Sequence, residues 1–544
     1  MVYPTMRLKY KLCLNTRWGQ VWTNLKHRIG LIYLPGALPC FEDFGNLPTD
    51  LVCSDALVDG KPASEILDMI IIPGGSLVES QSINKKVARE IMKMAESEKF
   101  VLGICSGFQI LAKETDVGRL SRVPITKEGL GLLDAEFKPL ICTDRVKATI
   151  TNTSFITSEV GKEVSGFHCH TYGKIVLHKD AKTILVSHAH RVNYRKDPQD
   201  LVSGVANKEG NVVGAFIHGL LDQNPAIIES ITKSLGINAI ELEAIRSRNA
   251  ELLERIKCEI GISTNIHQKN SVEQKTPHLL LVTATGSGSG KTFLVAGIAG
   301  ALKKRGFKVG VIKIGGDIRD VVPALYLIKE PIKGYSSIKI GESGWKPLDE
   351  AVEEASKNHD FLIVEGAMSA FTGLLMDKAV RPTSTAEVAA ALGASTIVVV
   401  SCDQEGIEGG LINTLNYVNI LRSLGVKITG VILNKARLSY LTDEIKLTLK
   451  RALENAGVEL LGIVPRLELE KRGMIPEIEI KYEEFGAKAI EAAEQHLNLD
   501  ALTKIADAPK LTQIDYAAFT EKFKNLLTNY ELNTSEGGKT QNCS

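Results

Sequence analysis

The chain has 544 residues, of which 44% are hydrophobic and 24% are charged, a composition typical of folded α/β domains rather than of disordered chains. Its 65 basic and 64 acidic side chains give a formal net charge of +1, which argues against a general attraction to nucleic acid or to an anionic membrane. No run of about 18 apolar residues occurs, so no transmembrane helix is expected. The nine cysteines are too sparse and too scattered for a disulfide framework, and no C-x-x-C pair occurs, so no structural zinc site is expected. This usage favours a reducing, cytoplasmic location.

The first part of the chain predicts an extension followed by one α/β domain. Residues 1–26 are basic, and we expect a peripheral extension there rather than a targeting peptide. Apolar runs alternate with helical patterns over residues 27–236, which predicts a doubly wound, mainly parallel sheet. The expected strands are Ile29–Leu34, Met69–Ile72, Phe100–Ile104 and Val212–Ile217, and the expected helices include Lys86–Ser97 and Ser106–Glu114.

The second part of the chain repeats this organisation. Residues 237–277 contain a charged helical stretch and a polar linker, and residues 278–505 predict a second doubly wound sheet. Residues 506–544 predict one more helix and a polar, disordered tail. The strands expected in the second sheet are Leu279–Ala284, Val309–Ile314, Phe361–Val364, Thr396–Ser401, Thr429–Leu433 and Leu460–Val464.

A glycine-rich loop follows the first of these strands and opens a helix, as a phosphate-binding loop requires. Glycines let backbone N–H groups surround phosphate oxygens at the positive end of a helix. We expect Lys291 to reach the β- and γ-phosphates of ATP and Thr292 to ligate Mg²⁺. The alternative is a glycine/serine-rich loop that binds no nucleotide, and the combination of strand, GKT and helix argues against it. The loop residues predicted to bind ATP are Thr285, Ser287, Gly288, Gly290, Lys291 and Thr292.

Four polar residues lie at the carboxyl ends of other strands, where ligands bind in such sheets. Asp317 and Glu365 offer oxygen ligands that could complete the Mg²⁺ shell with Thr292. Lys313 is suited to neutralising a transferring phosphoryl group, and Asn434 to hydrogen bonding with adenine. Each could instead be a solvated strand end, but together they indicate one crevice.

A cysteine in the first domain has the surroundings of a nucleophile. Cys105 stands in a G-x-C-x-G turn between a predicted strand and a predicted helix, and the helix N-terminus would lower the pKa of its thiol. His218 follows another apolar strand and is the candidate base. Backbone donors at Gly74, Gly75 and Ser106 could hold an oxyanion. The alternative is a buried structural cysteine, which the flanking glycines and the strand-end histidine disfavour.

Other histidines form weaker signals. His168 and His170 are expected on one strand face, as are His188 and His190. Such pairs could bind a metal, but no carboxylate ligands are evident nearby, so a metal site is disfavoured.

These motifs in combination resemble a known enzyme family. The first domain resembles the class I glutamine amidotransferase domain of cobyrinic acid a,c-diamide synthase and cobyric acid synthase. The second resembles their ATP-dependent synthetase domain, which is similar to dethiobiotin synthetase. The matching stretches of the first domain are 34–35, 41–44, 73–75, 103–109, 129–133, 166–170 and 218–219. Those of the second are 285–292, 313–320, 365–368, 384–386 and 430–434.

The sequence departs from the family at several points. The two domains stand in swapped order, and Leu220 occupies the position of the acid that usually completes a class I triad. Cys105 and His218 could therefore act as a dyad, with Asp222 as a weak candidate for an orienting acid. His168 stands where the family often has Glu. The family's aromatic-Asp-Gly motif and its basic stretch with histidine read 371-FTG-373 and 471-KRGMIPE-477 here, which leaves the identity of the acid substrate open.

The resemblance implies a carbon–nitrogen ligase of cobalamin biosynthesis. Cys105 would release ammonia from glutamine, and ATP with Mg²⁺ would activate a carboxylate of a tetrapyrrole or other polycarboxylic acid as an acyl phosphate, which ammonia converts to a carboxamide. Amidation of cobyric acid or nickel sirohydrochlorin type is an alternative. So is a regulatory P-loop ATPase with a vestigial amidotransferase domain, although such ATPases carry a lysine early in the loop, and residues 285–289 contain none. The sequence leaves open whether two copies form a homodimer.

Overall fold

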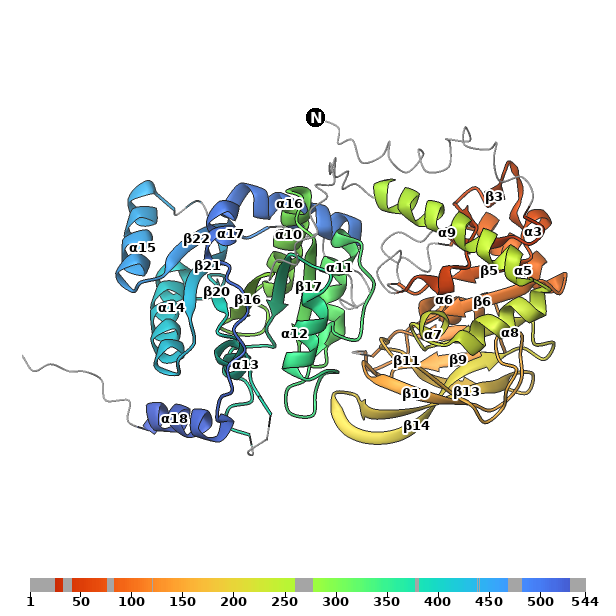
Figure 1. The fold of residues 1–544 in the computed structure, drawn as a ribbon, viewed down its shortest axis with the longest axis horizontal. Helices are drawn as coiled ribbons and strands as arrows, with labels where there is room; N and C mark the ends of the chain where they lie inside the picture. The colour runs from red at the N-terminus through yellow and green to blue at the C-terminus, as the bar shows by residue number, and fades with distance from the viewer. Residues whose placement is uncertain are drawn as a thin grey trace, which may run out of the picture.

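The computed structural model describes residues 25–32, 42–75, 83–119, 121–259, 277–376, 381–437, 439, 441–467 and 482–528. Two α/β domains lie next to each other along the long axis of the molecule (Figure 1). Most of the predicted extension, the linker at 260–276, the stretch at 471–477 and the tail from 529 onward lie outside the described residues.

The first domain is built on a nine-stranded sheet with the order β11-β10-β13-β14-β15-β6-β5-β1-β2. The strands from β15 to β2 pair in parallel, and those from β11 to β15 pair antiparallel. The bounds are β1 (Ile29–Ile32), β2 (Asp50–Val52), β5 (Met69–Ile72), β6 (Phe100–Ile104), β10 (Arg145–Ile150), β11 (Glu163–Phe167), β13 (Lys182–Val192), β14 (Arg195–Ala206) and β15 (Val212–Ala215). The four predicted strands are confirmed as β1, β5, β6 and β15, whereas the antiparallel half was not predicted.

The parallel half has both faces covered, which explains its uniformly apolar strands. Every residue of β1, β5 and β15 is buried. The covering helices include α5 (Lys85–Glu96), α6 (Ser106–Leu111), α7 (Leu220–Gln223), α8 (Pro225–Leu235) and α9 (Ala239–Glu259). Ile245 of α9 belongs to the core of this domain, so that helix is part of the first domain rather than of a linker.

Short elements complete the first domain. A four-stranded sheet has the order β12-β9-β7-β8, and a two-stranded one pairs β3 with β4. The bounds are η1 (Phe44–Asn46), β3 (Leu57–Val58), β4 (Lys61–Pro62), α3 (Ala63–Ile66), β7 (Glu114–Asp116), β8 (Thr126–Glu128), β9 (Ala135–Lys138) and β12 (Lys174–Leu177).

The second domain contains a seven-stranded sheet, all parallel, with the order β18-β17-β19-β16-β20-β21-β22. The bounds are β16 (His278–Ala284), β17 (Val309–Ile314), β18 (Ser337–Ile338), β19 (Phe361–Glu365), β20 (Ser395–Ser401), β21 (Ile428–Ala436) and β22 (Glu459–Pro465). All six predicted strands are confirmed, and the short edge strand β18 is added. The doubly wound fold predicted for this domain is therefore confirmed.

Helices cover both faces of this sheet (Figure 1). One face packs against α10 (Lys291–Lys304), α11 (Val322–Ile328), α16 (Tyr482–His496) and α17 (Leu499–Ile505). The other packs against α12 (Leu348–Ser356), α13 (Thr385–Leu392), α14 (Gly406–Ser423), α15 (Asp443–Asn455) and α18 (Tyr516–Thr528). The last helix expected from the sequence is thus confirmed as α18, and its Phe519 and Phe523 join the domain core. A single 3-10 turn, η2 (Ile318–Val321), joins β17 to α11.

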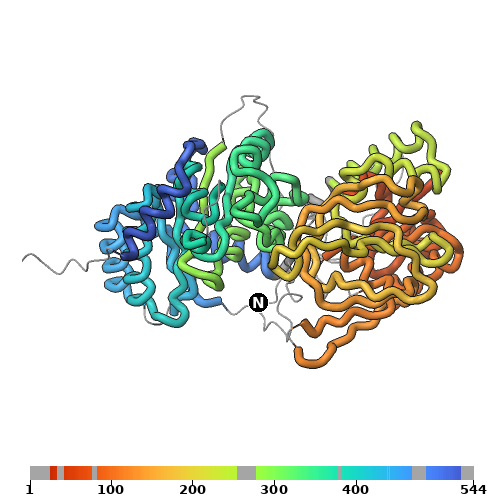
Figure 2. The backbone as a smooth tube through the Cα atoms, turned by 90° about the horizontal axis from the view of Figure 1, so that it is seen from below, coloured from red at the N-terminus to blue at the C-terminus, as the bar shows by residue number. Residues whose placement is uncertain are grey.

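The two domains touch through the antiparallel half of the first sheet. The turn of the β13–β14 hairpin lies against the second domain, as Figure 2 shows from below. Phe167 and Cys169, which end β11 and follow it, pack with the core of the second domain.

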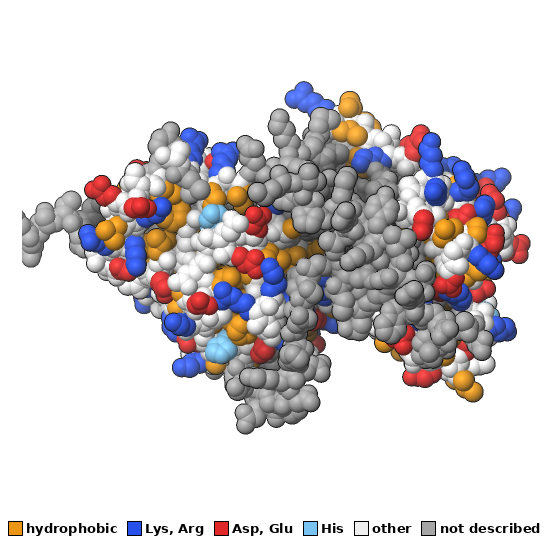
Figure 3. Space-filling model, turned by 90° about the horizontal axis from the view of Figure 1, so that it is seen from above, with side chains coloured by type: hydrophobic (Ala, Val, Ile, Leu, Met, Phe, Trp, Pro, Cys, Tyr) orange, Lys and Arg blue, Asp and Glu red, His pale blue; other side chains and the backbone are white. Residues whose placement is uncertain are grey.

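Two general expectations can be compared with the described residues. Within them, no helix is long and apolar enough to cross a membrane. On the face in Figure 3, acidic and basic side chains are intermixed over both domains. Four described cysteines are free thiols, but Cys53 is disulfide-bonded, which differs from the expectation of reduced cysteines throughout.

Candidate active sites

Cys105 stands in a sharp turn between β6 and α6. Its backbone has φ 51° and ψ −108°, a strained conformation that residues at functional sites often adopt. The flanking glycines are sterically required, because a Cβ at Gly103 would lie 2.5 Å from the Gly107 carbonyl oxygen, and one at Gly107 would lie 2.1 Å from that of Ile72. The turn therefore has the geometry of a nucleophile elbow.

The electrostatics of Cys105 differ from the expectation. Burial raises the pKa of its thiol well above the usual value, although the backbone N–H of Ser106 donates to the sulfur and opposes this shift. Desolvation therefore outweighs the helix terminus, and the resting group is a thiol rather than the expected thiolate. The sulfur lies 3.6 Å from the carbonyl oxygen of Cys169, the thiol's hydrogen-bond acceptor.

His218 has an acid partner that sequence reasoning missed. Its Nδ1 lies 3.0 Å from Oε1 of Glu42, and both side chains are fully buried. The other oxygen, Oε2, accepts from the backbone N–H of Gly219 at 3.3 Å. Burial lowers the pKa of His218 to about 3 and raises that of Glu42 to about 8, so both groups are neutral at pH 7 in this state. Glu42, rather than a residue at position 220, is therefore the acid beside His218.

Asp222, the weak candidate for the orienting acid, binds the backbone next to Glu42. Its carboxylate accepts from the backbone N–H groups of Asp43 at 2.9 Å and Gly45 at 2.7 Å. It thereby fixes the turn that directly follows Glu42. Burial and the nearby Glu42 raise the pKa of Asp222 to about 6.

The glycines after β5 lie beside both catalytic candidates. A Cβ on Gly74 would be 2.7 Å from Cε1 of His218 and 3.3 Å from Cβ of Cys105. This strand end thus joins Cys105 and His218 into one site, and only a residue without a side chain fits between them. Gly75 follows at the same end of β5.

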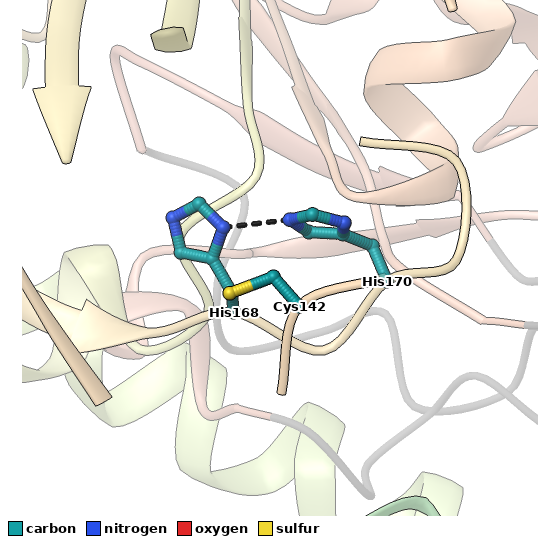
Figure 4. A group of neighbouring side chains, drawn as sticks. All are labelled: Cys142, His168 and His170. Carbon is teal, nitrogen blue, oxygen red and sulfur yellow. Dashed lines mark hydrogen bonds between the residues drawn. The ribbon is translucent and has the colours of Figure 1, made fainter. Parts of the chain in front are cut away.

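Two of the remaining histidines form a buried chain of hydrogen bonds (Figure 4). His168 and His170 lie beyond the end of β11, not within a strand, and their Nδ1 and Nε2 atoms are 2.6 Å apart. The Leu140 carbonyl, 3.3 Å from Nδ1 of His170, can only accept, which fixes the tautomer of that ring. His168 Nδ1–H then donates to His170, and the Ser187 hydroxyl donates to Nε2 of His168 at 2.9 Å.

Burial keeps these imidazoles neutral, since it lowers the pKa of His170 to about 3 and that of His168 well below its usual value. The ligand atoms of Cys142, His168 and His170 lie within 4.8 Å of one another. The hydrogen bonds nevertheless account for both rings, so we interpret the group as a support for the backbone at 168–170.

The predicted phosphate loop connects β16 to α10. Gly288 and Gly290 have φ of 76° and 84°, which favours glycine. Lys291 is buried, donates to the Met368 carbonyl at 3.0 Å, and has a pKa lowered to about 8 by burial and by the neighbouring Lys313. Lys291 thus lies in the loop where the negative charge of a bound phosphate would stabilise its protonated form.

The side chains expected to hold Mg²⁺ are partly assembled. Thr292 Oγ1 donates to Oε1 of Glu365 at 2.7 Å, and Oε2 of this buried carboxylate has no hydrogen-bond partner among the described residues. Lys313 lies 3.4 Å from Glu365 and 2.7 Å from Asp320. Burial would lower the pKa of Lys313, but these two acids raise it. A hydroxyl and carboxylate oxygens are ligands that Mg²⁺ prefers, so the residues fit this ion.

Two predicted residues make other contacts. Asp317 forms a bidentate ion pair with Arg319, with distances of 3.0 and 3.1 Å. The acid beside Lys313 is Asp320, which lies in the sequence motif at 313–320 but was not predicted as a site residue. Asn434 donates to the Ser289 carbonyl at 2.8 Å, so it supports the phosphate loop in this state rather than pointing its amide to a base.

Two family models match the chain. Residues 24–226 match the model of the CobB/CobQ-like glutamine amidotransferase domain, and residues 280–474 match that of the CobQ/CobB/MinD/ParA nucleotide binding domain. The two matched segments follow each other in this order along the chain, and the two domains are named after the models that match them. The amidotransferase domain contains Cys105 and His218, and the nucleotide-binding domain contains the phosphate loop.

Curated relatives match part of the chain. It is 34% identical over 194 residues to cobyric acid synthase from Clostridium botulinum, which covers 34% of each protein. It is 32% identical over 205 residues to hydrogenobyrinate a,c-diamide synthase from Mycobacterium tuberculosis, covering 36% of this chain and 43% of that one. The matched segments thus span less than half the length of these relatives.

Solved structures are also similar. PurLQS from Thermotoga maritima shows 24% identity and a TM-score of 0.29, covering 38% of this chain and 99% of the other. MinD with Mg-ADP from Pyrococcus horikoshii shows 17% identity and a TM-score of 0.25, covering 42% and 98%.

Proposed function

We propose that the chain is an ATP- and glutamine-dependent amidoligase of the cobyrinic acid a,c-diamide synthase type, which converts carboxylates of a tetrapyrrole-type acid to carboxamides. The observation that carries this proposal is the buried Glu42–His218 pair beside the Cys105 elbow, in the same chain as a phosphate loop. A carboxylate cannot be amidated at neutral pH without activation, and the two domains supply ammonia and activation separately.

The first half-reaction belongs to the amidotransferase domain. His218 takes the proton from the Cys105 thiol, and the sulfur attacks the side-chain carbonyl carbon of glutamine. Backbone N–H groups at Ser106 and Gly75 hold the oxyanion. Glu42 orients His218 and stabilises its charged form, and His218 then protonates the departing ammonia. Water hydrolyses the thioester to glutamate and restores the thiol.

The second half-reaction belongs to the nucleotide-binding domain. Lys291 and the glycine-rich backbone bind the phosphates of ATP, and Lys313 balances the charge on the γ-phosphoryl group as it moves to a substrate carboxylate. Thr292, Glu365 and Asp320 would hold Mg²⁺, which supplies charge neutralisation at the phosphates. Asp317 and Asn434 stay candidates for metal and adenine contacts once ATP is bound. Ammonia displaces phosphate from the acyl phosphate and leaves the carboxamide.

The alternatives differ in how they explain the first domain. A cobyric acid or nickel sirohydrochlorin amidase would use the same two sites on another acid. A regulatory ATPase with a vestigial amidotransferase domain has no need for Glu42 to be buried against His218, so this pair favours an active glutaminase.

Two variants test the proposal. Cys105→Ala should abolish glutamine hydrolysis while ammonium salts still support amide formation, because only the nucleophile is lost. Lys291→Ala should abolish amide formation from either nitrogen source and leave basal glutamine hydrolysis in place. Glutamate release and amide formation are measured for both proteins. Glutaminase activity that survives in Cys105→Ala would refute the assignment of the nucleophile.

A further inference from the structure

The segment 167–171, which follows β11, lies between the two sites. Phe167 exchanges backbone hydrogen bonds with His218 at 2.9 and 3.1 Å, and their rings stack with centroids 5.2 Å apart. The same phenylalanine ring lies 5.2 Å from that of Trp345 in the nucleotide-binding domain. The Cys169 carbonyl is the acceptor of the Cys105 thiol. A displacement of this segment would therefore change the surroundings of both the base and the nucleophile.

Hydrogen bonds hold the segment to the rest of the amidotransferase domain. The hydrogen-bond chain of His168 and His170 fixes its buried face to Leu140 and Ser187. Cys169, which lies between the two histidines, packs with the core of the other domain. The segment is thus fixed at its histidines and contacts the neighbouring domain at Phe167, Cys169 and Thr171.

Arg319 reaches this segment from the nucleotide-binding domain. Its Nη1 donates to Oγ1 of Thr171 at 3.1 Å, and its Nη2 donates to the hydroxyl of Tyr194 in the turn of the β13–β14 hairpin at 2.6 Å. Its Nε and Nη2 also bind Asp317. A guanidinium is a planar fork of fixed geometry, so these contacts set its position from both domains.

The short 3-10 turn that carries Arg319 also carries an acid of the ATP site. Asp320, the next residue, pairs with Lys313, which in turn lies beside Glu365 and the Thr292 hydroxyl. Phosphates and Mg²⁺ would compete for Lys313 and for these acids. Binding of ATP would therefore change the partners of Asp320, one residue from Arg319.

We propose that Arg319 and the segment 167–171 couple the two active sites, so that ATP–Mg²⁺ binding at the phosphate loop accelerates glutamine hydrolysis at Cys105. This inference rests on the proposed function. Arg319 is a positioning residue, because its hydrogen bonds go to Asp317, Thr171 and Tyr194 and not to the Cys105 thiol or to Lys291 and Lys313. The coupling would restrict ammonia release to the state in which the nucleotide-binding domain is able to activate a carboxylate.

The first test measures glutamate release with and without ATP–Mg²⁺ in the full-length protein. In the wild type we expect ATP–Mg²⁺ to raise kcat/KM for glutamine by about fivefold or more, the usual range of coupling between sites. In Arg319→Ala the ratio should fall to about one, and Arg319→Lys, which keeps the charge without the fork, should give little recovery. Arg305→Ala is the matched control, since Arg305 pairs with Asp500 on the surface of the same domain.

A second pair of variants removes the acceptors instead of the arginine. Thr171→Val with Tyr194→Phe should lower the same ratio, and adding Arg319→Ala should lower it no further, because the two acceptor variants and the arginine variant break the same two hydrogen bonds. Amide formation with ammonium chloride should stay within about twofold of wild type in each variant, which separates lost coupling from misfolding.

The outcomes are distinguishable. A wild-type protein with no glutaminase activity would refute the proposed function itself. A wild-type glutaminase that ATP–Mg²⁺ does not accelerate, or an Arg319→Ala protein that keeps the full acceleration, would overturn the coupling and leave the proposed function standing.

Discussion

Burial sets the protonation of each group in the site around Cys105. Desolvation keeps Cys105 as a thiol, His218 as a neutral imidazole and Glu42 as a protonated acid in the resting protein. We expect bound glutamine to change that balance, because an imidazolium formed when His218 takes the thiol proton favours loss of the Glu42 proton and so gains a carboxylate beside it. We therefore expect the nucleophile to be activated when glutamine is bound rather than in the empty site.

Glu42 should matter for catalysis more than for folding. We expect Glu42→Gln to lower kcat/KM for glutamine by about 100-fold or more, because the amide orients His218 but cannot stabilise its charge. Glu136→Gln is the control, since Glu136 makes a similar 3.0 Å contact with His178 on the surface. Steady-state glutaminase kinetics measure the effect, and activity equal to wild type in Glu42→Gln would contradict the assignment.

The raised pKa of Glu42 also predicts a pH dependence of stability. Folding lifts this pKa from 4.5 to about 8, so the folded protein binds the proton more tightly and is stabilised at low pH. An unfolded histidine is half protonated at about pH 6.5 and mostly neutral about one pH unit higher, so the comparison needs Glu42→Gln, which keeps His218. The contribution of Glu42 itself falls as pH rises toward 8. The decline should be at most about 1.4 kcal/mol per pH unit. Chemical denaturation from pH 6.5 to 8.5 should show this decline relative to Glu42→Gln, and parallel curves would contradict it.

At the scale of elements, the elbow depends on the close packing of α6 against β5. We expect Gly107→Ala to lower the free energy of unfolding by about 1–3 kcal/mol or more, because the new methyl group meets the Ile72 backbone. Gly286→Ala is a suitable comparison for stability, since a Cβ there meets no atom within 4 Å. Thermal unfolding without nucleotide measures both variants. Equal melting temperatures would show that the elbow relaxes more easily than the structure implies.

The strands that could be predicted are those buried on both faces. Continuous apolar runs such as β5 and β20 have few alternative interpretations, and they placed the phosphate loop and Cys105 correctly between strand and helix. The antiparallel half was missed because a strand such as β10 alternates exposed and buried residues with charged side chains at its exposed positions. The domain contact arises from this half, so the sequence offered no indication of it.

The acid of the site was hidden for a different reason. Glu42 lies 176 residues before His218, and no local pattern links the two. Asp43 and Asp222 also carry carboxyl groups, and only the folded chain shows which carboxyl group meets the imidazole. Cys105 and His218 could be predicted because each has its own turn and strand signature. An isolated acid near the start of a domain has none.

At the scale of the whole molecule, the two domains meet at a few polar contacts and at the apolar packing of Phe167 and Cys169. Arg191 of β13 contacts Ser343 of the nucleotide-binding domain, and Arg319 reaches back to Tyr194. The net charge of +1 fits chemistry confined to two local sites, where a few lysines and acids handle phosphate and carboxylate. The domain order differs from that expected of the family, but the contacts join the two sites within one chain.

One measurement tests most directly whether the chain transfers the side-chain nitrogen of glutamine to a tetrapyrrole-type acid. The purified chain is incubated with ATP, Mg²⁺ and glutamine labelled with ¹⁵N in its side chain, together with cobyrinic acid, hydrogenobyrinic acid or nickel sirohydrochlorin. The products are then read by mass spectrometry. The account predicts conversion of carboxylate to carboxamide with the label incorporated, and no conversion when ATP is omitted. Glutamine hydrolysis and ATP hydrolysis without amide formation on any of the three acids would contradict it.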